Sequence, residues 1–331
     1  MREELDDESA PRGDIVFEAR TEDGRRITSI LSSICLGTGR AHSHGAASAL
    51  AWCEVDDRGM TFTVNIAKSL QAVAYIRRDA VFHAWFLAEQ HRGDRPEERL
   101  EFGIDLAMLL ECLRIFGSGS ATAAPGALER TRAGAGLQIV FRAESMALGL
   151  TLHERHSMTE CEIRSLDIEM PHRVELNLQG KQKPPARIVI ASEDLKSGID
   201  ELEWGGDHVR EKRVTLRIAA QPGSLSLLIS ATDVGCEMVY PKEALVSFEA
   251  LSDLAFEYRF QHLRMALRSL KDAHQTQLQV DEDGTLEIKM RFASSSTSRS
   301  ELFSHFFLFP LLPEDDEDED ELGTVMTGTT G

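Results

Sequence analysis

The sequence lacks a long hydrophobic run, a cysteine cluster and any residue set typical of catalysis. No stretch approaches the roughly 18 uninterrupted apolar residues that a membrane-spanning helix requires. The acidic N-terminal segment also has no apolar core like that of a secretory signal. We therefore expect a protein inside the cell with no membrane partner. Its 331 residues, 42% of them hydrophobic, suffice for one large or two ordinary domains.

The cysteines form no recognisable metal or disulfide pattern. The five are Cys35, Cys53, Cys112, Cys161 and Cys236, with no Cys-x-x-Cys and no Cys/His cluster among them. This spacing is typical of buried thiols in a reducing compartment and not of a zinc site. The sequence also has no Ser/His/Asp set and no phosphate-binding glycine loop. We expect no metal, no cofactor and no enzymatic activity.

The formal net charge of −19 argues at first against a nucleic-acid partner. Much of it, however, lies in the terminal segments, since the run 314–321 alone contributes eight acidic residues. A mildly acidic body can still present one basic surface, so charge alone does not exclude DNA. We expect residues 314–331 to form a disordered acidic tail.

Short alternating strands with few helices dominate the pattern. Residues 60–66, for example, alternate apolar and polar side chains. Helical spacing of apolar residues predicts helices over 27–36, 106–116, a stretch beginning near Glu193, and 261–271.

The two halves of the chain repeat one order of elements: strand, helix, five strands, helix, three strands. The predicted divisions are a first domain over 14–168, a proline-containing connector over 169–186 and a second domain over 187–313. This order predicts an α+β fold of antiparallel sheets whose helices cover one face, as the inside of a curved wall requires.

Several segments resemble the eukaryotic sliding clamps related to proliferating-cell nuclear antigen. The stretch 304–310, leading into an acidic tail, resembles that family's last strand, proline and acidic end, and 162–169 resembles the strand before its interdomain connector. Within the family, residues 65–72, 109–118 and 240–242 are similar to the Rad-one subunit of the heterotrimeric nine-one-one DNA-damage checkpoint clamp. The resemblance covers roughly 14–313 and implies a sliding-clamp fold, with outer antiparallel sheets and inner helices.

The resemblance also implies a function. The chain would be a non-catalytic subunit of a heterotrimeric ring in the nucleus that encircles double-stranded DNA without reading its sequence. That ring would recruit repair enzymes and signal the DNA-damage checkpoint. Its partners would be two related clamp subunits, a clamp loader, and repair and checkpoint proteins.

Basic residues on the predicted helix 261–271 are the best local sign of DNA binding. Arg264, Arg268 and Lys271 follow one another at i, i+4 and i+7, which places them on one stripe. A solvated face explains this spacing equally well, but the resemblance turns such helices toward DNA, where Arg and Lys contact phosphates. Weaker candidates for the same role are Arg114, Lys196, Arg25 and Arg26.

The resemblance also places a subunit interface and a docking pocket. Edge strands near 159–168 and 236–240 would pair across subunits, with interface residues Cys161, Ile163, Met238 and Tyr240. A pocket beneath the connector would take partner proteins and would include Tyr75, Met290 and Phe303. Without the resemblance, an internal strand or a core position explains each of these residues as well.

Two other functions stay open. A homotrimeric replication clamp would trimerise alone, whereas a checkpoint clamp subunit would require two related partners. A metal-dependent 3′–5′ DNA exonuclease would need converging carboxylates. The acidic residues at 56–57 and 281–283 are more simply explained by turns.

Overall fold

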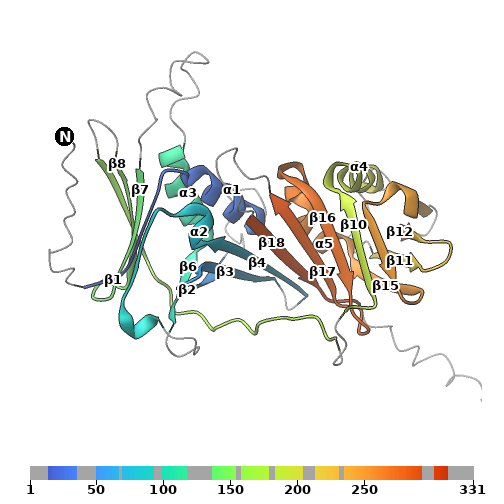
Figure 1. Ribbon diagram of the computed structural model, residues 1–331, viewed down its shortest axis with the longest axis horizontal. Coiled ribbons are helices and arrows are strands. Elements are labelled where there is room, and N and C mark those ends of the chain that lie inside the picture. The colour runs from blue at the N-terminus through green and yellow to red at the C-terminus, as the bar shows by residue number, and fades with distance from the viewer. Residues whose placement is uncertain are drawn as a thin grey trace, which may run out of the picture.

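The computed structural model consists of antiparallel sheets with helices packed against them (Figure 1). It describes residues 14–35, 50–66, 69–92, 99–117, 136–153, 158–178, 183–203, 213–230, 235–292 and 302–311. The acidic tail predicted at 314–331 lies outside these ranges. None of the helices within them is long and apolar enough to cross a membrane.

The first half of the chain contains strands β1 to β9. The strands are β1 (Ile15–Thr21), β2 (Leu50–Asp56), β3 (Gly59–Ile66), β4 (Leu70–Arg77), β5 (Ala84–Leu87), β6 (Leu100–Asp105), β7 (Gly136–Arg142), β8 (Ala147–His153) and β9 (Met158–Arg164). The helices are α1 (Gly24–Ile34), α2 (Arg78–Val81) and α3 (Leu106–Gly117), with the short 3-10 helix η1 (Glu89–His91).

The second half contains strands β10 to β18. The strands are β10 (Ala186–Ala191), β11 (Arg213–Ala219), β12 (Ser224–Ser230), β13 (Gly235–Pro241), β14 (Ser247–Ala250), β15 (Leu254–Arg259), β16 (Ala273–Val280), β17 (Leu286–Phe292) and β18 (Leu302–Leu308). The helices are α4 (Ser192–Glu203) and α5 (Phe260–Leu267), with the 3-10 helices η3 (Lys242–Ala244) and η4 (Arg268–Asp272).

Apart from the one-turn α2 and the 3-10 helices, each half has the predicted order of strand, helix, five strands, helix and three strands. Two predicted helices differ in detail. The first begins at Gly24, so Arg25 and Arg26 lie in its first turn and not before it. The predicted helix 261–271 is α5 followed by the tighter η4. The domain boundaries given above stay a prediction.

Three sheets organise the molecule. Their strand orders are β5-β1-β7-β8-β9, β14-β10-β16-β17-β18-β4-β3-β2-β6 and β13-β12-β11-β15. The middle sheet spans both halves, because the last strand, β18, pairs with β4 and sets Phe306 opposite Ala72. This arrangement leaves β9 and β13 at the edges of the two smaller sheets.

The helices lie where their apolar stripes can be buried. On α1, the residues at spacings of three and four, Ile27, Ile30 and Ile34, are buried and the helix packs on β4 and α3. The rings of Phe102 and Phe141 stack with centroids 4.5 Å apart and join the nine-stranded sheet to the five-stranded one. Such aromatic contacts add to the ordinary burial of apolar area.

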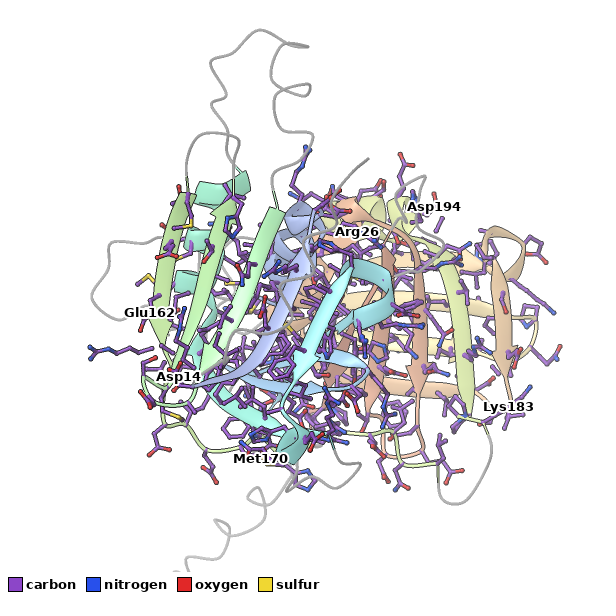
Figure 2. All side chains as sticks on the ribbon, turned by 60° about the vertical axis from the view of Figure 1, so that its left-hand side comes forward. Asp14, Arg26, Glu162, Met170, Lys183 and Asp194 are labelled. Atoms are coloured by element: carbon purple, nitrogen blue, oxygen red, sulfur yellow. The ribbon has the colours of Figure 1, made fainter. Side chains whose placement is uncertain are left out.

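Helices α1, α3 and α4 lie on the opposite side of the molecule from the connector (Figure 1). In Figure 1, α1, α3 and α4 lie along the upper side, while the connector runs along the lower side. Figure 2 shows the same division from a second direction, with Arg26 and Asp194 at the top and Met170 of the connector at the bottom. One side therefore offers helix surfaces and the other a groove beneath the connector.

Candidate DNA-facing helices, ring edges and docking groove

A row of basic side chains follows the helical segment α5–η4. Arg264, Arg268 and Lys271 are all exposed. The side chains buried beneath them are Leu263, Leu267 and Leu270. The α-helix gives way to the 3-10 helix η4 at Arg268. Because residues three apart lie nearly above one another in a 3-10 helix, Lys271 stays in line with Arg268. The three charges thus share one exposed face, and their contact with DNA stays a prediction.

The other predicted DNA contacts have different surroundings. Arg25 and Arg114 are exposed, and Lys196 is half-buried and ion-paired within α4. Arg26 differs, because its side chain is only 12% exposed and its Nη1 donates a hydrogen bond to the Ala80 carbonyl oxygen at 2.9 Å. Its guanidinium thus binds α2 within the chain, and the prediction that Arg26 contacts phosphate is wrong.

Strand β9 forms the outer edge of its sheet, where Figure 2 labels Glu162. Its half-buried Cys161 and buried Ile163 face inward, on a strand that packs against α3. Burial and the neighbouring Cys161 raise the pKa of Cys112 on α3 to about 11. The side chains predicted for the interface therefore fix the strand to its own helix.

Strand β13 forms the corresponding edge in the second half. Met238 is half-buried, and the buried Tyr240 donates a hydrogen bond from its hydroxyl to the Asp194 carbonyl oxygen at 3.3 Å. Gly198 makes this approach possible, since a Cβ there would lie 1.9 Å from the tyrosine hydroxyl. Burial raises the pKa of Tyr240 to about 12, so the hydroxyl stays a donor at neutral pH. On both edges the backbone, more than the inward side chains, is left for a partner strand.

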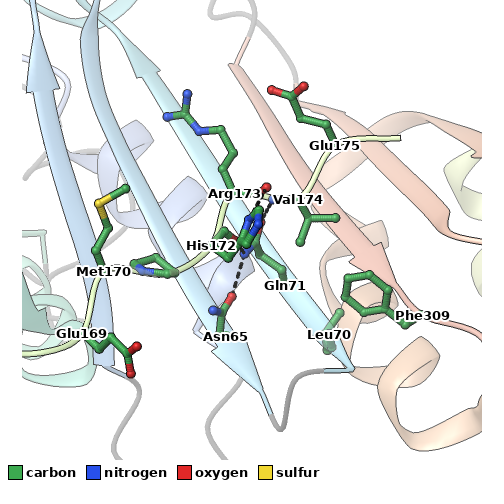
Figure 3. A pocket seen from close by; sticks show the side chains of 11 residues that line it. Asn65, Leu70, Gln71, Glu169, Met170, His172, Arg173, Val174, Glu175 and Phe309 are labelled. Atoms are coloured by element: carbon green, nitrogen blue, oxygen red, sulfur yellow. Dashed lines mark hydrogen bonds between the residues drawn. The ribbon is translucent and has the colours of Figure 1, made fainter. Parts of the chain in front are cut away.

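A cavity of about 590 Å³ lies beneath the first part of the connector (Figure 3). Its apolar lining comes from β4, the connector and the segment after β18, and consists of Leu70, Met170, Pro171, Val174 and Phe309. A pocket with this mixture of apolar walls and a few polar groups suits the apolar side chains of a peptide.

One polar side chain, Gln71, forms the link between the sheet and the connector in this groove. Its Nε2 donates to Asn65 Oδ1 and to the His172 carbonyl oxygen, both at 2.8 Å. Its Oε1 accepts the Val174 N–H at 3.1 Å (Figure 3). Buried though it is, Gln71 therefore has partners at both ends of its amide.

The predicted pocket residues are only partly brought together. Tyr75 and Phe303 face each other across β4 and β18, both half-buried. Tyr75 lines a neighbouring cavity of about 450 Å³ beneath the later part of the connector. Met290 is fully buried, because on β17 it alternates with outward residues and points into the core. Its assignment to the pocket was wrong.

That second cavity contains a buried acid. The Glu287 side chain is 9% exposed and its Oε1 accepts a hydrogen bond from His305 Nδ1 at 2.9 Å, with Lys289 Nζ at 3.7 Å. Burial alone would raise the pKa of Glu287, but His305 and Lys289 outweigh it and hold the pKa below its ordinary value. The ring of Tyr75 packs edge-on against His305, with centroids 5.0 Å apart.

The connector has further anchors that sequence reasoning missed. The buried Asp281 accepts the Asn177 N–H through Oδ2 at 2.9 Å, and Asp283 accepts the Asn177 side-chain amide at 2.6 Å. Arg173 donates to Glu54 at 2.7 Å. The sequence pattern predicts a turn at Asp281 and Asp283. It does not indicate that these acids also bind the connector, which is more than 100 residues away in sequence. No group of three or more His, Cys, Asp or Glu in the described ranges could hold a metal ion.

Comparison with known protein families identifies the chain. The model for the family "Repair protein Rad1/Rec1/Rad17" matches residues 16–291, which is most of the sequence. The chain belongs to the Rad1/Rec1/Rad17 family. The resemblance drawn from the sequence is thereby confirmed.

Individual relatives of this Rad1/Rec1/Rad17 protein are distant in sequence but match most of its length. The Drosophila melanogaster "DNA repair protein Rad1" is 23% identical over 314 residues, covering 94% of this chain and 99% of the relative. The Mus musculus "Cell cycle checkpoint protein RAD1" is 26% identical over 246 residues, covering 72% of this chain and 77% of the relative.

The fold of this family member is that of a sliding clamp. The crystal structure of proliferating cellular nuclear antigen from Entamoeba histolytica superposes with a TM-score of 0.65 at 14% identity, covering 90% of this chain and 100% of that one. The predicted fold class is therefore confirmed: outer antiparallel sheets with helices on one side.

Proposed function

We propose that this chain is a non-catalytic subunit of a heterotrimeric ring that encircles double-stranded DNA, recruits repair enzymes and signals the DNA-damage checkpoint in the nucleus. The observation that carries the proposal is that β9 and β13, one from each half of the chain, are edge strands of separate sheets. Edges so placed suit head-to-tail pairing that closes into a ring. Membership of the repair family and relatives named as checkpoint proteins support the role.

DNA would pass the face of α5 and η4 on which Arg264, Arg268 and Lys271 are exposed together. Phosphate contacts from these residues would be independent of base sequence and weakened by salt. Partner proteins would dock on the other side, in the apolar groove between the connector and Phe309. A clamp loader would be needed to open and close the ring around DNA.

Charge reversal tests the DNA-facing assignment. A ring carrying Arg264→Glu, Arg268→Glu and Lys271→Glu should slide off the ends of linear DNA faster, or bind DNA more weakly, than wild type. The slope of log affinity against log salt should fall by up to about three, because each phosphate contact contributes roughly 0.9. The matched control reverses Arg187, Lys242 and Lys183, which are exposed on other elements. Equal DNA retention by both variants would refute the assignment.

Assembly tests the heterotrimer. The chain purified alone should elute as a monomer and form a trimer only with two related clamp subunits. A homotrimer from the chain alone would instead favour a replication clamp. The assembled ring should leave end-labelled DNA intact with Mg²⁺ or Mn²⁺ present, and metal-dependent shortening from the 3′ end would establish a nuclease instead.

A further inference from the structure

The C-terminal end of the described chain is fixed beside the helix that carries the basic row. The Leu311 N–H donates a hydrogen bond to the Glu257 carbonyl oxygen at 2.7 Å. Glu257 belongs to β15, which ends at Arg259 and leads directly into α5. Whatever follows Leu311 therefore starts close to the beginning of the basic helix.

The chain continues from that point into its most acidic segment. Residues 314–321 read Glu-Asp-Asp-Glu-Asp-Glu-Asp-Glu, with no basic residue between Leu311 and the C-terminus. Glu314 is three residue steps beyond Leu311, at most about 10 Å, and the eight acidic residues can extend over roughly a further 27 Å.

The basic row lies within this reach. From Glu257, two extended residues and five helical ones lead to Arg264, a path of roughly 14 Å. Lys271 is roughly another 13 Å along α5 and η4.

The charges are also complementary. Residues 260–271 contain no acidic side chain, and Arg259, Arg264, Arg268 and Lys271 are exposed. In the part of the chain that the structure describes, no carboxylate forms an ion pair with Arg268 or Lys271. A tethered run of eight carboxylates at millimolar effective concentration would find these cations at low salt.

We propose that the acidic segment 314–321 binds the basic row Arg264, Arg268 and Lys271 of its own chain and competes with DNA phosphates for it. The intramolecular contact needs no DNA, whereas the competition rests on the proposed function. The segment acts as an internal polyanion that DNA must displace. Weak electrostatic contacts to DNA are thereby suppressed at low salt, and DNA affinity falls less steeply with salt than it would without the segment.

Lysine coupling tests the contact without DNA. A carbodiimide joins a lysine amine to a carboxylate with loss of water, and Lys271 is the one lysine of the row. In the full chain at low salt, coupling of 314–321 to Lys271 should exceed coupling to the exposed Lys242 by about fivefold. The preference should fall at least about threefold in 0.5 M salt, where screening is strong. Mixing ¹⁴N- and ¹⁵N-labelled chains separates coupling within a chain from coupling between chains.

Two variants decide the outcome. Arg264→Gln with Arg268→Gln should reduce the Lys271 coupling, and Glu→Gln with Asp→Asn throughout 314–321 should abolish it. Equal coupling to Lys271 and Lys242, or a Lys271 yield indifferent to salt and to the arginine change, would overturn the proposal.

A DNA-binding measurement distinguishes failure of this inference from failure of the proposed function. The ring with neutralised 314–321 should bind duplex DNA about fivefold more tightly at 50 mM salt, with the gain vanishing near 300 mM. The matched control neutralises the five acids within residues 3–8 and should change affinity little. Selective coupling without any DNA binding would contradict the proposed function alone. DNA binding by the basic row without selective coupling would contradict this inference alone.

Discussion

At the scale of single residues, Glu287 shows how one buried acid is kept charged. Its carboxylate accepts from His305 and lies near Lys289, and these groups hold its pKa below the ordinary value despite burial. Because the pKa is lower in the folded than in the unfolded chain, ionisation of Glu287 stabilises the fold above about pH 4.3. That stabilisation is lost as the pH falls through the folded-state pKa.

We expect Glu287→Gln to lower the free energy of unfolding by roughly 1–2 kcal/mol near pH 7, because glutamine keeps the shape but not the charge-assisted bond. The gap between variant and wild type should shrink as the pH falls below about 4.3. Urea unfolding followed at a series of pH values measures it. Glu249→Gln, an exposed acid on β14, is the matched control and should stay within about 0.5 kcal/mol of wild type. A gap that stays constant down to pH 3.5 would count against this account.

At the scale of elements, the connector is an extended segment whose position depends on a few hydrogen bonds. Gln71 binds both the His172 carbonyl oxygen and the Val174 N–H, while Asp281 independently holds Asn177. These hydrogen bonds fix the position of the connector over the apolar groove. Loosening one anchor should therefore act locally and leave the next one in place.

Gln71→Ala should leave the Val174 N–H without its partner and lower its protection in hydrogen exchange by about 1–3 kcal/mol, the cost of one unsatisfied group. The Asn177 amide should stay protected, because Asp281 is untouched. Gln71→Glu keeps an acceptor for the Val174 N–H but loses the donor to the His172 carbonyl oxygen. The protection of the Val174 amide in this variant should therefore lie between those of wild type and Gln71→Ala. Equal exchange at Val174 in all three proteins would show that Gln71 does not position the connector.

The elements themselves could be predicted because their signal is local. The stripe of Ile27, Ile30 and Ile34 and the alternation over 60–66 each record burial on one face, which sequence spacing reports directly. The docking groove could not, because it joins β4, the connector and Phe309, which are remote in sequence. The prediction for Met290 is wrong because the resemblance indicates which strand lies near the pocket but not which face of that strand each residue occupies.

At the scale of the whole molecule, the two outer edges determine what the chain can assemble into. In an antiparallel sheet, the N–H and C=O of one residue point to the same neighbour, and those of the next residue point the opposite way. Of Cys161 and Glu162 on β9, therefore, one bonds β8 and the other presents its N–H to the open edge. Proline removes the N–H at either position.

Comparing Cys161→Pro with Glu162→Pro thus separates folding from ring closure. The variant that removes the outward N–H should keep a nearly wild-type thermal transition as a free chain, yet fail to join the neighbouring subunit in a pull-down. The variant that removes the bond to β8 should lose roughly 3 kcal/mol of stability before assembly is even tested. Proline at the matching edge β13, at Met238 or Val239, should give the same division against the other neighbour. If every stable variant still assembled, the ring would have to close through surfaces other than these two edges.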